Sequence, residues 1–191
     1  MPENKVEYGL SKVHYAPYTE VDGVITFGTP IPIPGAVSMT GDPVGESSKF
    51  YADNMVFYVV NSNQGYENTL SIARIPQQFA IDALGEELDE TDGVLNEVAD
   101  KQGKPFALLF QFEGDKKAVR HVMYNCTAAR PSINGQTKEE GVEIQPNELT
   151  LTASPIELDG KLLVKTKTTD TTTAAIYDSW FTTVYRKAPG V

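Results

Sequence analysis

The stretch Phe50–Gly85, FYADNMVFYVVNSNQGYENTLSIARIPQQFAIDALG, sets the order of elements from which the fold of this chain is predicted. Its part Met55 to Val60 is an apolar run of β-branched and aromatic residues, which favours a strand. A polar, glycine-containing turn is expected at Asn61 to Gly65, and a second strand over Tyr66 to Ile75. The stretch therefore predicts two strands that lead into one short helix.

The short helix is predicted between Pro76 and Gly85. Proline is tolerated in the first turn of a helix because its missing N–H has no partner to lose there, and glycine readily takes the left-handed conformation that ends a helix. At about 3.6 residues per turn, the apolar residues of this segment share one arc, so we expect the helix to pack on a β-rich domain. These residues are Phe79, Ala80, Ala83 and Leu84.

Most of the remaining chain alternates apolar and polar residues with a period of two, as antiparallel strands do. A hairpin is predicted from Phe106 through a turn at residues 113–115 to Cys126, and a further strand over residues 149–153. We predict a mainly β, antiparallel β-sandwich with one short flanking α-helix, as a single domain over residues 1–191. Further turns are predicted at Asp22-Gly23, Asn134-Gly135 and Asp159-Gly160.

Three segments have no obvious place in a closed domain. The proline-rich segment from Thr29 to Gly35 is predicted to run extended and to expose Ile31 and Ile33. It either packs as a loop on its own domain or contacts a neighbouring molecule. The acidic residues 85–104 and the threonine-rich residues 166–173 are expected to be solvated loops.

Composition is that of an ordinary globular protein, with 40% hydrophobic and 22% charged residues in 191. The first residues do not resemble a signal peptide, and no apolar run approaches the roughly 18 residues of a membrane-spanning helix. The single cysteine, Cys126, excludes an intrachain disulfide and fits synthesis in a reducing compartment. We expect a protein made in a cytoplasm-like compartment.

The formal charge of −10 argues against a protein that grips nucleic acid by its phosphates, since that binding needs clustered Lys and Arg. The longest basic feature is the pair Lys116-Lys117; Lys161, Lys165 and Lys167 are spread along a later strand. By itself, the acidity indicates solubility and distinguishes poorly between functions.

Few residues offer chemistry. His14, His121 and Cys126 are the only His and Cys residues, and they lack the clustered spacing of a zinc site. His121 and Cys126 are an odd number of residues apart, so a regular strand would place them on opposite faces. The acidic run from Glu86 to Gly93 lacks the ligand spacing of an EF-hand. With no hydrolase, kinase or dehydrogenase motif, we expect no catalytic, cofactor-binding or metal site, and no enzyme. Trp180 is expected to anchor the C-terminal segment in the core.

The Phe50–Gly85 stretch resembles the major tail protein, or tail tube protein, of long-tailed, non-contractile bacteriophages. The resemblance extends over nearly the whole chain. It continues in Asn4–Leu10, Val13–Ala16, Gly28–Ala36, Phe106–Phe110, Arg120–Ala128, Arg130-Pro131, Ile176-Tyr177 and Trp180-Phe181.

The resemblance implies a structural virion protein that self-assembles into stacked, hexameric rings. The rings form the tail tube, through which the genome passes into the host cell. It implies copies of the chain, a tape-measure protein, and distal tail and tail-terminator proteins as partners, and a location in the host cytoplasm before assembly and in the virion afterwards. DNA would pass through the lumen without specific binding, and an acidic wall would keep it from sticking.

Terminal arms and long loops join the rings in this family. For this chain the resemblance implies an N-terminal arm over about residues 1–10, a C-terminal arm over about residues 185–191, and no C-terminal immunoglobulin-like domain. The residues expected to contact neighbouring subunits are Tyr8, Leu10, Ile31, Ile33 and Tyr185.

Two alternatives stay open. One is a secreted or surface β-sandwich module that binds a carbohydrate or a protein, which binding to a glycan array would support. The other is an enzyme whose site is assembled only in space, because paired carboxylates need not be close in sequence.

Overall fold

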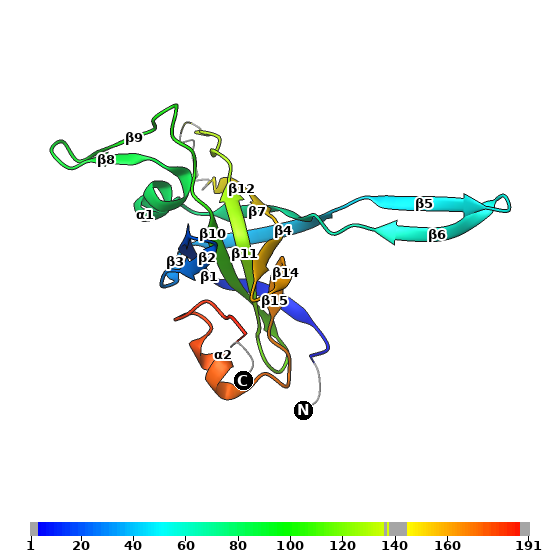
Figure 1. The fold of residues 1–191 in the computed structure, drawn as a ribbon. Coiled ribbons are helices and arrows are strands. Elements are labelled where there is room, and N and C mark those ends of the chain that lie inside the picture. Colours follow the sequence, from blue (N-terminus) through cyan, green and yellow to red (C-terminus); the bar gives the residue numbers. More distant parts are fainter. Residues whose placement is uncertain (1–3, 136, 138–144, 188–191) are drawn as a thin grey trace.

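The computed structural model of the protein describes residues 4–135, 137 and 145–187. Nine strands form one sheet (Figure 1). They are β1 (Glu7–Val21), β2 (Val24–Phe27), β3 (Ile31–Pro32), β4 (Ala36–Val44), β7 (Gly65–Ile72), β10 (Phe106–Gly114), β11 (Val119–Ala128), β12 (Asn147–Ala153) and β15 (Lys165–Lys167). The strand order is β2-β1-β10-β11-β12-β7-β4, with β3 beside β1 and β15 beside β11, and all pairs are antiparallel. The predicted mainly β, antiparallel, sandwich-like fold is confirmed.

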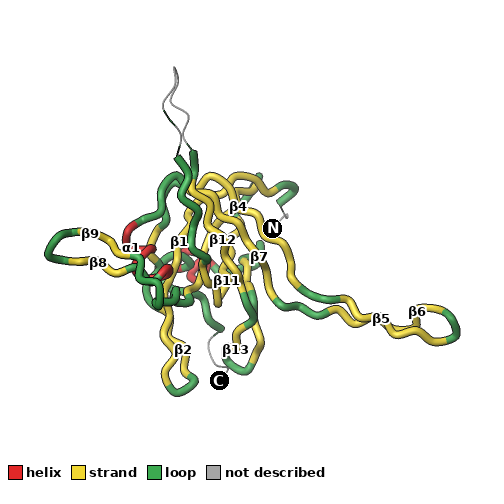
Figure 2. Tube along the Cα trace, turned by 90° about the horizontal axis from the view of Figure 1, so that it is seen from above, coloured by secondary structure: helices red, strands yellow, loops and turns green. Residues whose placement is uncertain are grey.

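Three further hairpins extend from this sheet: β5 (Ser47–Ala52) with β6 (Met55–Asn61), β8 (Glu87–Asp89) with β9 (Val94–Asn96), and β13 (Ile156–Leu158) with β14 (Lys161–Leu163). The β5–β6 hairpin continues the paired strands β4 and β7 outward from the body. In Figures 1 and 2 the β5–β6 and β8–β9 hairpins leave the body on opposite sides. The acidic segment expected to be a solvated loop therefore contains a hairpin.

The stretch Phe50–Gly85 folds only partly as expected. Its two strands exist as β6 and β7, although β7 ends at Ile72. They do not pair with each other, because β6 pairs with β5 while β7 lies between β4 and β12. Gly65 starts β7 with a φ of 115°, and a Cβ there would lie 1.9 Å from the Ala153 carbonyl oxygen. Only glycine therefore fits this close approach.

The predicted helix is present as α1 (Gln77–Phe79), which continues into a single π-helical turn, η1 (Ala80–Leu84). Gly85 ends it in the left-handed conformation, with a φ of 81°. Three residues of the expected apolar arc are buried and Leu84 is half-buried, so this part of the prediction is confirmed. A second helix, α2 (Ala174–Ser179), was not predicted.

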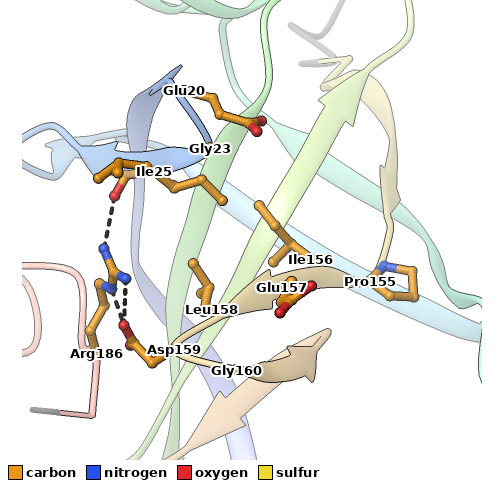
Figure 3. A pocket seen from close by; sticks show the side chains of 11 residues that line it. Glu20, Gly23, Ile25, Pro155, Ile156, Glu157, Leu158, Asp159, Gly160 and Arg186 are labelled. Carbon is orange, nitrogen blue, oxygen red and sulfur yellow. Dashed lines mark hydrogen bonds and ion pairs between the residues drawn. The ribbon is translucent and has the colours of Figure 1, made fainter.

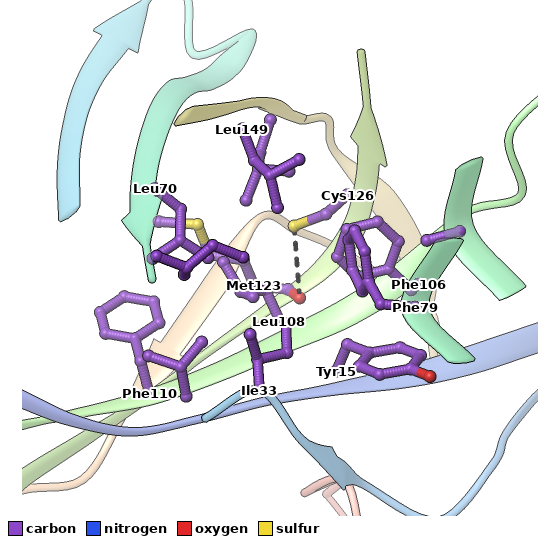
Figure 4. Packing of buried hydrophobic residues seen from close by; sticks show 14 of the residues in the cluster. Tyr15, Ile33, Leu70, Phe79, Phe106, Leu108, Phe110, Met123, Cys126 and Leu149 are labelled. Carbon is purple, nitrogen blue, oxygen red and sulfur yellow. Dashed lines mark hydrogen bonds between the residues drawn. The ribbon is translucent and has the colours of Figure 1, made fainter. Parts of the chain in front are cut away.

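Two hydrophobic clusters lie on opposite faces of the central strands. The first contains Tyr15, Phe79 and Phe106, whose rings meet edge to face at centroid distances of 5.0–6.2 Å (Figure 4). The second contains Leu109 and Trp180. Strand β10 is thus covered on both faces, as the near-continuous apolar run in its sequence requires.

The C-terminal segment is fixed to the sheet by Trp180, as expected. Its indole is 2% exposed, donates a hydrogen bond to the His121 carbonyl at 3.2 Å and stacks on the ring of Tyr185. Arg120 adds a second attachment, because its guanidinium lies 3.7 Å from the ring centroid of Tyr177 in α2 and donates to the Tyr177 carbonyl.

The predicted turns at Asp22-Gly23 and Asp159-Gly160 join β1 to β2 and β13 to β14. Asn134-Gly135 lies between β11 and β12, next to residues outside the described ranges, so the turn there stays a prediction. The threonine-rich segment is not wholly a solvated loop: it begins in β15, and Thr168 is buried.

Candidate assembly surfaces

The β5–β6 hairpin, residues 47–61, is called the hairpin arm. Every residue of β6 is exposed, and the large apolar side chains of the arm expose similar fractions of their surface, for example 62% for Phe50, 61% for Tyr51 and 69% for Phe57. The two strands make their main contacts with each other. A contiguous apolar surface of this kind on a folded domain marks an interaction site.

The turn of the hairpin arm has the backbone conformation of a tight hairpin. Asp53 and Asn54 have φ angles of 52° and 61°, and two positive φ angles are what a tight hairpin turn requires. Asn and Asp tolerate this conformation better than other non-glycine residues. The arm is therefore a defined hairpin that presents its side chains outward.

A groove of about 760 Å³ lies between the β1–β2 and β13–β14 hairpins (Figure 3). Ile25, Ile156 and Leu158 supply apolar surface, and Glu20 and Glu157 add carboxylates. Arg186 closes one side, where it donates hydrogen bonds to Asp159 and, at 2.8 Å, to the Ile25 carbonyl. The same hairpins expose further apolar side chains, namely Val21, Val24 and Leu162.

A third surface is the outward face of β12, β7 and β4. The aligned row Thr150, Thr69 and Thr40 crosses these three strands. The neighbouring rows add hydroxyl and carboxylate groups, and none of the three strands contains Lys or Arg. This acidic polar face consists of Ser38, Thr40, Asp42, Glu67, Thr69, Glu148, Thr150 and Thr152, and Ser71 in the same rows is buried.

The residues predicted to contact neighbouring subunits do not form one surface. Tyr8 is 58% exposed, whereas Leu10 is half-buried against the first cluster and Tyr185 against the second. The expected exposure of Ile33 is wrong: it is 2% exposed, because its N–H bonds to Val13 and its side chain joins the first core cluster. Ile31 pairs with Tyr15 and is half-buried.

The proline-rich segment thus packs on its own domain, which was one of its two predicted alternatives. The contact roles predicted for these five residues stay predictions.

The described part of the N-terminal arm lies along the sheet. Tyr8 pairs with Glu113 of β10, and the Asn4 side chain bonds to the Lys117 carbonyl at 2.6 Å. Residues 1–3 and 188–191, the ends of the two expected arms, lie outside the described ranges.

The titratable groups of the interior are structural. His121 and Cys126 face the same cluster, not opposite faces, because a bulge in β11 shifts the register between them. Burial raises the pKa of the Cys126 thiol to about 12, so it is a poor nucleophile. Burial, with the charges of Lys167 and Lys165, lowers the pKa of His121 to about 4.

The part of the chain that the structure describes contains no group of three or more His, Cys, Asp or Glu residues placed to hold a metal ion. Nor is any helix in the described ranges long and apolar enough to cross a membrane.

The hairpin arm was not predicted as a site from the sequence. Met55 to Val60 was predicted as a strand, and the proline-rich segment was expected to be the exposed apolar one. The available signal was that this run is apolar at successive positions, while the strand before it also carries Phe50 and Tyr51. An apolar strand without alternation indicates a strand that is buried on both faces, either in its own domain or against a partner.

No protein-family model and no curated protein matches the sequence. Among solved structures, the fold is similar to a chain in the cryo-EM structure of the anti-feeding prophage cap, a tube-terminating cap. The TM-score is 0.48 at 14% sequence identity, over 88% of this chain and 96% of that chain. A likeness at this level does not decide the family or the function.

Proposed function

We propose that this chain is a structural subunit of a bacteriophage tail tube that assembles with copies of itself. The observation that carries the proposal is the hairpin arm, whose large apolar side chains are exposed in the part of the chain that the structure describes. The resemblance of the sequence to major tail proteins supports the same role.

In this proposal identical subunits close into hexameric rings and the rings stack into a tube. Such an assembly uses heterologous contacts, in which one patch of a subunit meets a different patch of the next. The chain offers suitable surfaces: the hairpin arm, the groove between the β1–β2 and β13–β14 hairpins, and the edge of β4, which has no further strand beside it among the described residues. An open edge strand is a liability in a monomer but an interface in a polymer.

The acidic polar face is the surface that we assign to the channel wall. Its carboxylates repel the phosphates of a passing genome, and the absence of Lys and Arg from β4, β7 and β12 leaves no cation to retain DNA. The tape-measure, distal tail and tail-terminator proteins are the further partners, and the virion is the final location.

Sedimentation velocity over a concentration series tests the role of the arm. The wild-type chain is compared with a variant in which residues 46–62 are replaced by a short Gly-containing turn between β4 and β7. We expect the wild type to form large, uniform particles and the shortened variant to stay monomeric. The circular dichroism band of the buried Trp180, which lies outside the deleted segment, should be retained. A matched control shortens the β8–β9 hairpin, which leaves the body on the opposite side. Equal assembly of the wild type and the variant without the hairpin arm would remove the basis of the proposal.

A further inference from the structure

Asn134 and Gly135 lie in the part of the chain between β11 and β12. Residues 129–135 have no regular secondary structure, and residues 132–135 are all exposed, with Ile133 at 100%. Asn134 is the only asparagine in the sequence that a glycine follows. The two core clusters and the assembly surfaces contain neither residue of this pair.

An asparagine side chain can react with the backbone of its own chain. Its amide carbon, Cγ, is an electrophile, and the backbone nitrogen of the following residue is placed so that its attack on Cγ closes a five-membered ring. The attack has three requirements. The backbone has to bring the nitrogen to Cγ, the nitrogen has to lose its proton, and the side-chain amide has to be free to turn.

Gly135 meets the first two requirements. Without a side chain, its backbone takes conformations that are closed to other residues. The surroundings add no restriction, because a Cβ at Gly135 would have no other atom within 4 Å. Its N–H has no hydrogen-bond partner among the described residues. The nitrogen can therefore give its proton to solvent without breaking a bond within the described fold.

The side chain of Asn134 meets the third requirement. Within the described part of the chain its one hydrogen bond runs from Nδ2 to the Ser132 Oγ at 3.0 Å. Both residues are exposed and only two positions apart, so water competes with this bond. Neither β11 nor β12 holds the amide in place.

The exposed Asn63 shows the opposite situation. The residue after it, Gln64, donates its N–H to the Val44 carbonyl at 2.8 Å. The Asn63 side chain is also held, because its Oδ1 accepts a hydrogen bond from the Gly65 N–H at 3.1 Å. A reaction at Asn63 would first have to break these bonds, so exposure alone does not make an asparagine reactive.

We propose that Asn134 and Gly135 form a site of spontaneous covalent self-modification. The Gly135 nitrogen loses its proton to solvent base and forms a bond to the Asn134 Cγ. The bond from Cγ to Nδ2 breaks, and ammonia leaves with a proton taken from water. Water then opens the resulting succinimide at either of its two carbonyl carbons, which gives aspartate or isoaspartate. The sequence needs no oxidant, reductant or cofactor.

The modification changes the segment between β11 and β12 in two ways. Both products carry a carboxylate in place of an amide, which makes the formal charge of −10 more negative by one unit. Isoaspartate also adds a methylene group to the backbone. Because water does not return the amide, the modified fraction rises with the age of the protein. This inference does not rest on the proposed function.

Peptide mass mapping of the full chain measures the reaction. The purified protein is kept in mildly alkaline buffer, sampled over days and digested in mild acid, in which the ring forms slowly. The peptide that contains Asn134 should gain one mass unit and separate into two products, the larger of which a protein isoaspartyl methyltransferase labels. An unchanged peptide would overturn the site, and conversion to aspartate alone would overturn the ring mechanism in favour of direct hydrolysis.

Gly135→Ala tests the need for glycine. It keeps Asn134 and Ser132 and adds one methyl group, for which there is room. Conversion of Asn134 should slow by about tenfold or more, because the backbone reaches the attacking conformation less often. An unchanged rate would contradict the role assigned to Gly135. Circular dichroism of each variant confirms that the fold is kept.

Gln64→Gly separates the effect of structure from that of sequence. This variant has a second Asn-Gly pair, at Asn63, whose glycine N–H still donates to the Val44 carbonyl. Within the same molecule, Asn63 should convert about tenfold or more slowly than Asn134. Equal rates at the two positions would overturn the argument from the unbonded N–H of Gly135. Assembly is measured separately, so either result leaves the proposed function as it stands.

Discussion

Replacing His121 with Phe should remove a pH-dependent loss of stability that the wild-type protein shows in mild acid. The His121 ring stacks on Phe110, with ring planes 1° apart and centroids 5.0 Å apart, and its buried Nε2 has no hydrogen-bond partner among the described residues. Phe keeps the size and the stacking. The bond from Trp180 is also kept, because it goes to the backbone carbonyl.

The size of the effect follows from linkage. The pKa of His121 is lowered from 6.5 to about 4 in the fold by burial, with the nearby Lys167 and Lys165 acting in the same direction. Between these values the unfolded chain binds the proton and the folded chain does not, so the stabilisation is fully present above pH 6.5 and is lost as the pH falls to about 4. At about 1.4 kcal/mol per pH unit, the wild type should lose about 2 kcal/mol between pH 7.5 and pH 5 from this residue.

The assay is urea unfolding at pH 7.5, 6 and 5, followed by the fluorescence of Trp180, the only tryptophan. Carboxylates with lowered pKa values, such as Glu113, which accepts hydrogen bonds from Ser11 and Gln111, affect both proteins and cancel in the difference. We expect the stability of His121→Phe to fall less than that of the wild type by about 2 kcal/mol over this range. Curves that fall in parallel would refute the assignment of a neutral, buried imidazole.

Three further predictions concern the core, the start of β7 and the channel wall. Trp180→Ala should lower the free energy of unfolding by about 3–5 kcal/mol, measured by urea unfolding with circular dichroism, because it empties the centre of the second cluster. Gly65→Ala should cost about 2 kcal/mol or more in the same assay, because its Cβ would collide with the Ala153 carbonyl. Thr150→Cys creates the only reactive thiol, since Cys126 is buried. A small maleimide should label this thiol in tubes and in monomers alike. A polymer-linked maleimide wider than the channel should label monomers only. Labelling of assembled tubes by the wide reagent would place the acidic polar face on the outside.

Local patterns in the sequence predicted much of the fold. The turn chemistry at Asp22-Gly23, the left-handed Gly85 and the placement of successive β10 residues on opposite faces each depend on a few neighbouring residues, and each is found in the structure. What failed depended on contacts far apart in sequence. Ile33 is buried because β1 and the first core cluster lie over it, and the β11 bulge, which brings His121 to the same face as the cysteine, has no signature in the local sequence.

The candidate site was the least predictable part. The apolar run from Met55 to Val60 has the composition of a core strand, and composition alone does not distinguish a strand buried in its own domain from one that is buried in an assembly. The structure shows why this run is exposed. The next strand, β7, pairs with β4 and β12, so β5 and β6 pair only with each other and extend outward as a two-stranded ribbon.

Negative-stain electron microscopy of the purified chain over a concentration series, with light scattering on the same samples, tests the central claim most directly. The account predicts rings or hollow tubes of uniform width, which form above a threshold concentration. Dispersed monomers at every concentration, both alone and after addition of the distal tail proteins, would contradict self-assembly as the function of this protein.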